Sequence, residues 1–474
     1  MKIEKESQNL SMNTQQRLQH LYWRAGFGMS PKEWSSKKNR STQKAIDELF
    51  RNAHQASQRK IVKNDNGIES SKMEMSFKAD KKEKRKQNKI RIGAHNTDWV
   101  LRMGNPEESA LLEKMILFWH GHFACTTNIP GWAKKQLNTI RQHALGNFRE
   151  LVLAIAKDGS MIRFLNNQQN KKRKPNENFA REVMELFTIG RGNYSEKDVK
   201  EAARAFTGWS SNLKGGFVFR KRQHDFGQKI FFGKRGKWDG DDIINMILEK
   251  RETSEFIARK AYRFFVNEKI DEQNVKYLAR VFYDSNYDIE KLMRTIFESK
   301  WFFDEKNVGV KIKSPIELLA GMIRTFEVDF KNPAALIFIE KALGQVLFNP
   351  PNVAGWGGGK NWIDNSTLML RLNLANVLFQ NSDLNIKIKE EFEAQKRNKR
   401  KRNVQASVNF TPFYNLFKRE DEKLLLDKMG GFILQTKGQL NEATFENFVI
   451  KSNKEDLVKT MCLRIMSLPE YQLM

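Results

Sequence analysis

The sequence predicts a mostly α-helical protein built as one large multi-helical domain. Apolar side chains recur at helical spacing along most of the 474 residues, and Ser, Asn, Pro and Gly stand where helices begin and end. Strand-like patterns are confined to a short region near residues 217–232, where we expect a small β-hairpin. No repeat of fixed period divides the chain. We therefore predict one domain over residues 1–474, all-α or nearly so.

The N-terminal third contains several well-marked helices. Thr14 to Arg24 carries an apolar stripe and ends at glycines, and Ser30 followed by Pro31 has the composition of a helix N-terminus. Another helix begins after Pro106, and its apolar residues continue to Trp119. Two more helices are expected at 134–145 and 148–156.

The stretch from Pro175 to Trp209 predicts a hairpin of two amphipathic helices. Asn176 can cap the first, whose apolar stripe includes Phe187, and Ser195 can cap the second, whose stripe includes Phe206. Both phenylalanines are expected to be buried. Downstream, helical patterns cover residues 241–248, 254–265, 274–283, 289–298, 315–326, 334–343, 416–434 and 454–467.

The amino-acid composition limits the classes of protein to which this chain can belong. Hydrophobic residues make up 40% of the chain and include 34 Phe, which predicts an aromatic-rich core. No run approaches 18 apolar residues, so a transmembrane helix is not expected. The only cysteines are Cys125 and Cys462, which excludes a disulfide scaffold and favours a reducing compartment. The first residues lack the apolar segment of a signal peptide, so we predict a cytoplasmic protein.

The net charge of +27 is concentrated in part in two segments. We predict flexible basic excursions at 53–89 and 385–408, because neither has an apolar period. Such charge attracts polyanions. Basic solvated loops are the favoured explanation, and nucleic acid is an unlikely partner because no nucleic-acid-binding module accompanies the charge.

The polar face of the helix after Asn176 carries a candidate catalytic group. Glu177, Arg181 and Glu185 follow one another at i, i+4 and i+8, with Asn178 beside the row. One interpretation is an exposed ladder of ion pairs. The other is a cleft wall in which one carboxylate is free for proton transfer or metal binding, with Asn176 and Asn178 contacting substrate.

Two histidine motifs are candidate metal ligands. His120 and His122 would point to the same side in extended backbone, as a chelating pair requires, but would diverge on a helix. His224 and Asp225 follow the first predicted strand. Together these side chains would form a mixed nitrogen and oxygen site suited to Zn, Mn or Fe. The alternative is core and surface histidines with a solvated turn.

A glycine-rich loop separates Trp356 from Trp362 in the sequence PPNVAGWGGGKNW. It is not a phosphate-binding Walker A loop, because Ala354 stands where the first glycine should be and Asn361 where Ser or Thr should be. The two tryptophans could stack on a sugar ring or an apolar group. The alternative is a tightly packed structural loop.

These segments together resemble the bacterial family known as domain of unknown function 1800 (DUF1800). The matching motifs, in chain order, are HLYWRAGFGMSP, FWHGHF, HALGNFREL, NENFAREVMELFTIGRGNYSEKDVKEAARAFTGW, HDFGQKIFFG, KSPIELL, PPNVAGWGGGKNWID and SLPEYQL.

The resemblance implies one family domain and a shared site among these motifs. It supplies no reaction. This chain departs from the family at Asn166, where relatives usually have Asp. Many relatives look exported, and their genes often neighbour a family that resembles alkaline phosphatases and sulfatases. The resemblance therefore implies a protein partner of that kind, and export together with it.

We predict a metal-assisted hydrolase acting on a polar polymer or glycan. Glu177 or Glu185 would be the general base or a metal ligand, Arg181 would pair with an anion, and the histidines would hold the metal. The alternative is a non-catalytic helical accessory protein that docks the sulfatase-like partner through an exposed apolar patch. A third hypothesis is a polyanion-binding protein that uses the basic segments.

Overall fold

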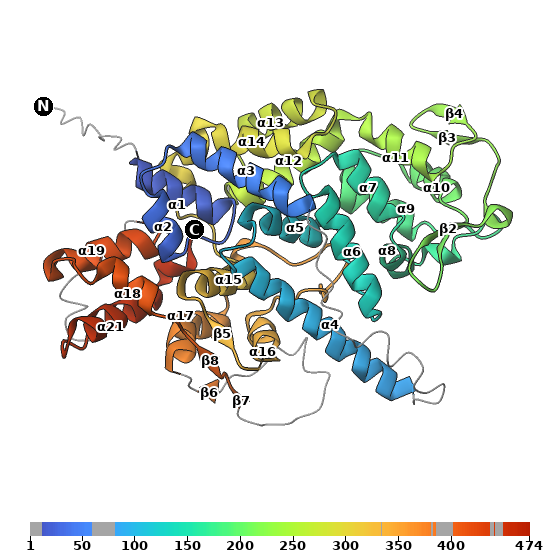
Figure 1. The fold of residues 1–474 in the computed structure, drawn as a ribbon. Coiled ribbons are helices and arrows are strands. Elements are labelled where there is room, and N and C mark those ends of the chain that lie inside the picture. The colour runs from blue at the N-terminus through green and yellow to red at the C-terminus, as the bar shows by residue number, and fades with distance from the viewer. Residues whose placement is uncertain are drawn as a thin grey trace, which may run out of the picture.

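The computed structural model describes residues 12–58, 81–332, 334–380, 383–384, 402–436, 440 and 449–474. Over these residues the fold is mostly helical, with four small two-stranded antiparallel sheets (Figure 1). The predicted fold class is confirmed. Figure 1 shows the strand pairs β1–β2 and β3–β4 at one end of the molecule and the C-terminal helices at the other.

Helix α5 (Ala110–His122) lies at the centre of the N-terminal part of the fold. It is buried along nearly its whole length and contacts α3, α4 and α6. Leu, Met, Phe and Trp side chains occupy most of its faces, which is the composition of a helix enclosed by others. The other helices of this part are α1 (Thr14–Arg24), α2 (Pro31–Lys37), α3 (Thr42–Gln58) and α4 (Lys81–Gly104).

Side-chain caps fix several helix starts where the sequence predicts them. Ser30 accepts a hydrogen bond from Glu33 N at 3.2 Å and Pro31 opens α2, which together form a capping box with proline at the first position. Ser195 and Asp198 form the same arrangement at the start of α10 (Glu196–Ala205). These reciprocal bonds satisfy the first N–H groups of each helix.

The predicted helix hairpin lies in the middle of the chain. Its first arm is α9 (Asn178–Glu182) continuing into a π-helix (Val183–Thr188), and α9 contacts α10. The rings of Phe179 and Phe206 meet edge-on with centroids 5.0 Å apart. The preceding helices are α6 (Pro130–His143), α7 (Phe148–Ala156) and α8 (Gly159–Phe164).

The predicted single hairpin at 217–232 is wrong in its pairing. Strand β2 (Phe217–Phe219) pairs with β1 (Trp209–Ser211), and β3 (Lys229–Phe231) pairs with β4 (Lys234–Gly236). Hydrogen bonds and backbone angles within each turn determine which strands pair. Asn212 accepts the N–H of residues 214 and 216 within the first turn, and Phe232 and Gly233 both have positive φ in the second.

The C-terminal half is again helical and returns to the N-terminus. Met474 exchanges two backbone hydrogen bonds with Lys311, and Figure 1 places α19 beside α2. The helices are α11 (Gly240–Leu248), α12 (Arg251–Phe265), α13 (Glu272–Asp284), α14 (Ile289–Glu298), α15 (Pro315–Phe326), α16 (Ala334–Leu343), α17 (Asn365–Gln380), α18 (Thr411–Phe417), α19 (Glu422–Ile433) and α21 (Lys454–Met466).

Short strands and 3-10 turns complete the described structure. Strand β5 (Asp329–Phe330) pairs with β8 (Ala406–Ser407), and β6 (Asp383–Leu384) pairs with β7 (Arg402–Asn403). The 3-10 turns are Asn167–Gln169, Lys221–Gln223, Lys300–Phe303, Glu305–Asn307, Gly359–Trp362 and Pro469–Gln472.

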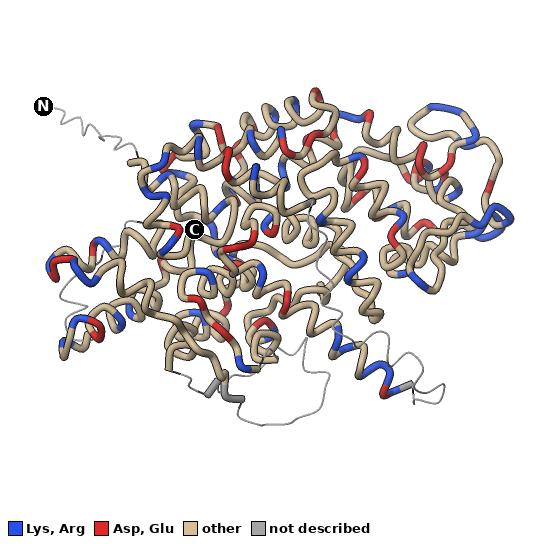
Figure 2. Tube along the Cα trace, in the orientation of Figure 1, with Lys and Arg blue, Asp and Glu red and all other residues tan. Residues whose placement is uncertain are grey.

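Described helices and strands reach into both segments predicted as basic excursions. Residues 53–58 belong to α3, and residues 81–89 form the exposed outer end of α4, which projects from the body in Figure 2. Residues 402–408 include β7 and β8, where Val404 and Ala406 are buried. Residues 59–80 and 385–401 lie outside the described residues. No helix in the described ranges is long and apolar enough to cross a membrane.

Replacing Phe206 or Phe187 with Ala is expected to lower the free energy of unfolding by about 3–5 kcal/mol, because each change leaves a cavity in the core. Both side chains are almost fully buried. Chemical denaturation followed by circular dichroism measures this. Phe226→Ala is the matched control, since that ring is 59% exposed. An equal loss in all three variants would contradict the assigned core.

Candidate functional site

The predicted catalytic row forms surface ion pairs. Arg181 donates to both carboxylate oxygens of Glu196 at 2.7 and 2.8 Å and to Glu177 at 3.1 Å. Glu185 pairs with Arg191 and accepts from the hydroxyl of Tyr194 at 3.0 Å. Within the row only Glu177 and Arg181 pair with each other, and the other ion pairs tie α9 and the π-helix to neighbouring segments.

The two asparagines beside this row bond to the chain itself. Asn176 Oδ1 accepts from Asn178 N at 3.0 Å, and Asn178 Nδ2 donates to the carbonyl of Leu165 at 3.1 Å. Asn166, the departure from the family pattern, has φ 59°, a left-handed conformation that Asn tolerates. These bonds fix the loop that enters α9.

His122 stabilises the end of the π-helix together with Lys260. Its Nε2–H donates to the carbonyl of Phe187 at 3.0 Å, while its Nδ1 accepts from Lys260 Nζ at 3.2 Å. Lys260 also donates to the carbonyl of Leu186 at 3.0 Å. Helix ends leave such carbonyls without partners, so both ring nitrogens of His122 serve the fold. Burial and the Lys260 charge hold the pKa of His122 well below its usual range.

His120 points to a different side and sits among aromatic rings. Its Nε2 accepts from Phe348 N at 3.2 Å, and its ring lies 5.1 Å from Trp99 and 5.6 Å from Trp356. Burial lowers the pKa of His120 to about 4. The structure thus brings together His120 and Trp356, two residues predicted from separate motifs. Trp362 is buried, and its carbonyl accepts from Thr367.

The predicted metal ligands are not gathered in one place. Helix α5 continues through His122, so of the two alternatives the helical one holds and the two histidine side chains diverge. His224 donates from Nδ1 to the carbonyl of Thr207 at 2.8 Å, and Asp225 pairs with Arg204. Across the described ranges, no three His, Cys, Asp or Glu side chains are grouped as a metal ion requires. The residues predicted for Zn, Mn or Fe do not fit such an ion.

A different group of ionisable side chains does converge, deep in the core. We call it the cationic centre, defined as the buried carboxylate of Glu317 and five buried cations. Each of the six side chains belongs to a residue that is at most 6% exposed. The cations come from α1, α5, the segment before α15, and α17; they are Arg24, Lys114, Lys311, Lys313 and Arg371.

Contacts between these residues show that they form one cluster. Lys114 pairs with Glu317, whose charge acts on the other four cations as well. The ammonium groups of Lys114 and Lys311 lie 5.6 and 5.7 Å from the centre of the Phe264 ring. Arg371 donates to the carbonyl of Lys313 at 3.0 Å. The cluster joins segments far apart in sequence.

The centre has more positive than negative charge, unlike other buried pairs of this protein. Arg141 has Glu113 as its own partner, and Arg324 binds Glu33 at 2.7 Å. In the cationic centre five cations share one buried carboxylate side chain. A buried charge without a partner costs several kcal/mol, so this surplus is a strong departure from the usual arrangement.

Both arginines of the centre retain unused donors. Within the described residues, Nε and Nη1 of Arg24 and Nε and Nη2 of Arg371 have no hydrogen-bond acceptor. Arg24 Nη2 donates to the carbonyl of Asn307 at 2.6 Å, which holds its guanidinium in place. Buried donors normally find acceptors. These N–H groups are therefore positioned to bind an acceptor that comes from outside.

Burial shifts the protonation of the cations. It lowers the pKa of Lys311 to about 8, of Arg24 to about 9 and of Arg371 to about 10. Burial alone would raise the pKa of Glu317, but the surrounding ammonium groups outweigh it and hold that pKa below its usual range. Burial also lowers the pKa of Lys114 and holds that of Lys313 well below its usual range. Near neutral pH both arginines therefore remain charged, and Lys311 and Lys313 are the groups that lose their protons most readily.

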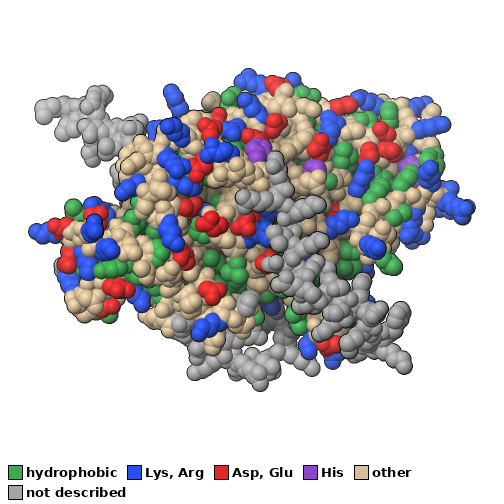
Figure 3. All heavy atoms as spheres, in the orientation of Figure 1, with side chains coloured by type: hydrophobic (Ala, Val, Ile, Leu, Met, Phe, Trp, Pro, Cys, Tyr) green, Lys and Arg blue, Asp and Glu red, His purple; other side chains and the backbone are tan. Residues whose placement is uncertain are grey.

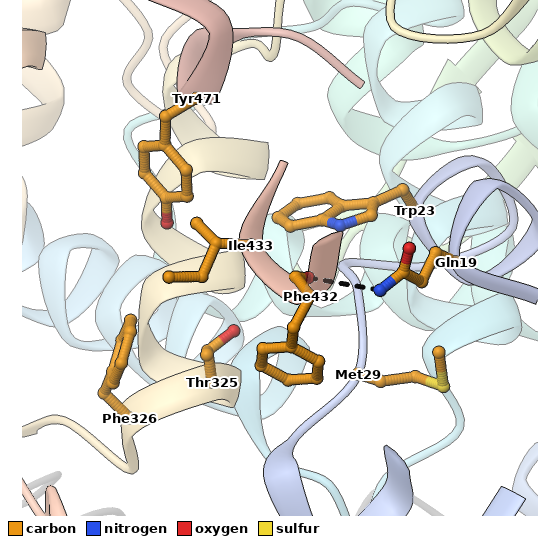
Figure 4. Close-up of a pocket in the computed structure, with 8 residues that line it drawn as sticks. All are labelled: Gln19, Trp23, Met29, Thr325, Phe326, Phe432, Ile433 and Tyr471. Atoms are coloured by element: carbon orange, nitrogen blue, oxygen red, sulfur yellow. Dashed lines mark hydrogen bonds between the residues drawn. The ribbon is translucent and has the colours of Figure 1, made fainter. Parts of the chain in front are cut away.

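A small pocket borders the centre (Figure 4). Trp23 and Tyr471 line it, and the same two rings flank Lys313 Nζ, which lies 3.8 and 4.1 Å from their centroids. The other lining residues are apolar or uncharged: Gln19, Met29, Thr325, Phe326, Phe432 and Ile433. The pocket therefore adds no charged group to the centre.

Sequence analysis did not identify the cationic centre. Arg24, Lys313 and Glu317 lie inside motifs that carry the family resemblance, yet each looked like an ordinary helix-terminal residue. Glu113 and Lys114 offered a usable signal, because they are adjacent charges in a helix that is otherwise apolar on most faces. Charged residues in such a helix predict buried partners.

Fold and site together define a multi-helical protein with a buried, cation-rich centre. Within that class, the chain belongs to the family described as protein of unknown function (DUF1800), whose sequence model matches residues 20–473. The match confirms the resemblance and covers nearly the whole chain. No curated protein and no solved structure matches it.

Histidine ¹⁵N NMR on protein labelled at its seven histidines tests the structural role of His120 and His122. We expect His122 as the Nε2–H tautomer and His120 unprotonated down to about pH 5, because burial lowers both pKa values. His122→Gln assigns its resonance. Titration of either ring near its ordinary pKa, or metal-induced shifts of both rings together, would contradict this assignment.

Proposed function

We propose that this protein binds an anionic ligand, or an anionic group of a larger ligand, at the cationic centre. The observation that carries the proposal is the surplus of buried positive charge around Glu317. The lysines donate to backbone carbonyls, Lys311 to that of Arg263 and Lys313 to that of Tyr471, but these neutral acceptors do not balance the charge. Because burying cations without matching negative charge destabilises a fold, an anion that completes the site best explains why they are retained.

The chemistry of the donors indicates an oxyanion. Guanidinium groups bind carboxylate, phosphate and sulfate through paired N–H donors, and Arg24 and Arg371 have such donors to spare. Lysine ammonium groups add charge without a fixed geometry. The enclosed position of the centre favours a small group or the charged end of a chain.

The three functions predicted from the sequence receive different degrees of support from the structure. The metal-assisted hydrolase gains no support from Glu177, Arg181, Glu185 or the histidines, because their polar atoms bind the protein itself. An accessory protein that docks a sulfatase-like partner remains a prediction. The hypothesis of a polyanion-binding surface gains little support, because acidic and basic side chains are interspersed on the face drawn in Figure 3.

Titration calorimetry with sulfate tests anion binding. Sulfate keeps its charge between pH 7 and 9, so any change in affinity reports on the protein. We expect a single saturable site whose Kd rises with pH, because Lys311, with a pKa lowered to about 8, loses its positive charge over this range. Lys311→Met should raise Kd by about tenfold or more, the loss of one charge-assisted contact.

Two controls separate binding from folding. Lys306→Met removes a surface lysine that pairs with Asp271 and should leave Kd unchanged. Without ligand, Lys311→Met should be at least as stable as wild type, whereas Glu317→Gln should lose roughly 3–5 kcal/mol, because it leaves buried cations without their carboxylate. Equal affinity in wild type and Lys311→Met, or no binding by a folded wild type, would overturn the proposal.

A further inference from the structure

One carboxylate beside the cationic centre, that of Glu268, differs from Glu317 because it is exposed to solvent. Glu268 lies in the loop between α12 and α13, and its side chain is 41% exposed. Its Oε1 is 3.9 Å from Lys311 Nζ, and its charge also acts on Arg24. Glu268 therefore stands at the edge of the cationic centre, where the buried charge meets water.

Glu268 is held by charge rather than by hydrogen bonds. In the part of the chain that the structure describes, its carboxylate has only the ionic contact with Lys311. Glu317, in contrast, pairs with Lys114 and accepts from Ser314 N at 2.8 Å. A carboxylate without fixed hydrogen bonds can leave at a low cost, whereas Glu317 is fixed.

The glycine loop of the PPNVAGWGGGKNW motif lies directly against this carboxylate. A Cβ on Gly359 would meet the Glu268 carboxylate at 2.7 Å, and one on Gly358 would meet Oε1 at 3.6 Å. Gly359 also has φ 57°, which glycine adopts most readily. The backbone of this loop therefore closely approaches the protein's own carboxylate.

We propose that ligand enters the cationic centre at Glu268 and takes the place of its carboxylate beside Lys311. This inference rests on the anion binding proposed above. Exchanging one single negative charge for another gains little Coulomb energy, whereas a dianion gains more. Glu268 thereby acts as an exchangeable counter-ion that lowers the apparent affinity for every anion that must displace it. The anion expected to displace it is therefore a dianionic oxyanion, such as a phosphate or sulfate group, which gains more from the centre than a monocarboxylate does.

The test compares sulfate, inorganic phosphate and acetate binding to wild type and Glu268→Gln by calorimetry at pH 7. The variant nearly preserves shape and removes the competing charge. We expect all three anions to bind more tightly to Glu268→Gln, by about tenfold, with the ratio of sulfate to acetate affinity unchanged, because a displaced competitor weakens each anion alike. Phosphate, only partly dianionic at pH 7, is compared with sulfate, which is fully dianionic. Glu272→Gln, a nearby exposed glutamate paired with Arg259, should match wild type.

The outcomes separate the two proposals. If wild type binds sulfate but Glu268→Gln binds it no more tightly, the role of Glu268 is overturned while anion binding stands. If both proteins are folded and neither binds any of the three anions, anion binding itself is overturned. If Glu272→Gln tightens binding as much as Glu268→Gln does, the effect is long-range surface charge, and Glu268 is not the counter-ion.

Discussion

The pairing of Lys114 with Glu317 is the interaction on which the centre of this protein depends. Lys114 projects from α5, the most enclosed helix, and Glu317 lies in the first turn of α15. Glu317 also completes a capping box with Ser314. A single carboxylate thus starts a helix, neutralises a core lysine and sets the potential felt by four further cations. Removing it would leave an uncompensated cluster of buried charge.

This constraint explains how distant segments are held together. Arg24 at the end of α1, Arg371 in α17 and the segment before α15 all meet near Glu317. The backbone bonds between Lys311 and Met474 bring the last residues to the same place. The motifs that mark the family at both ends of the chain therefore meet in one cluster, although the sequence separates them by hundreds of residues.

Helices were largely predictable because caps and apolar stripes are local. Ser30, Ser195 and Gly190 mark boundaries through bonds made within a few residues. Helix α17 was not predicted, since its leucines at 368, 370, 372 and 374 alternate like those of a strand, and only tertiary burial on several sides accounts for that pattern. Strand pairing in the hairpins was missed for the opposite reason: short-range turn geometry at Asn212 and Phe232 outweighed the apparent strand pattern.

The candidate site was less predictable than the fold. His120 and His122 looked like a chelating pair only if the helix ended at Gly121, and it continues. The cations of the centre lie in separate elements, so no spacing in the sequence links them.

The most direct test of the account is an anomalous difference map from crystals of the protein grown with selenate, a dianion that matches sulfate in shape. The account predicts a selenium peak within hydrogen-bonding distance, roughly 3 Å, of Lys311 and the unused N–H groups of Arg24. Selenate confined to surface lysines, with Arg24 and Lys311 contacting protein atoms alone, would contradict it.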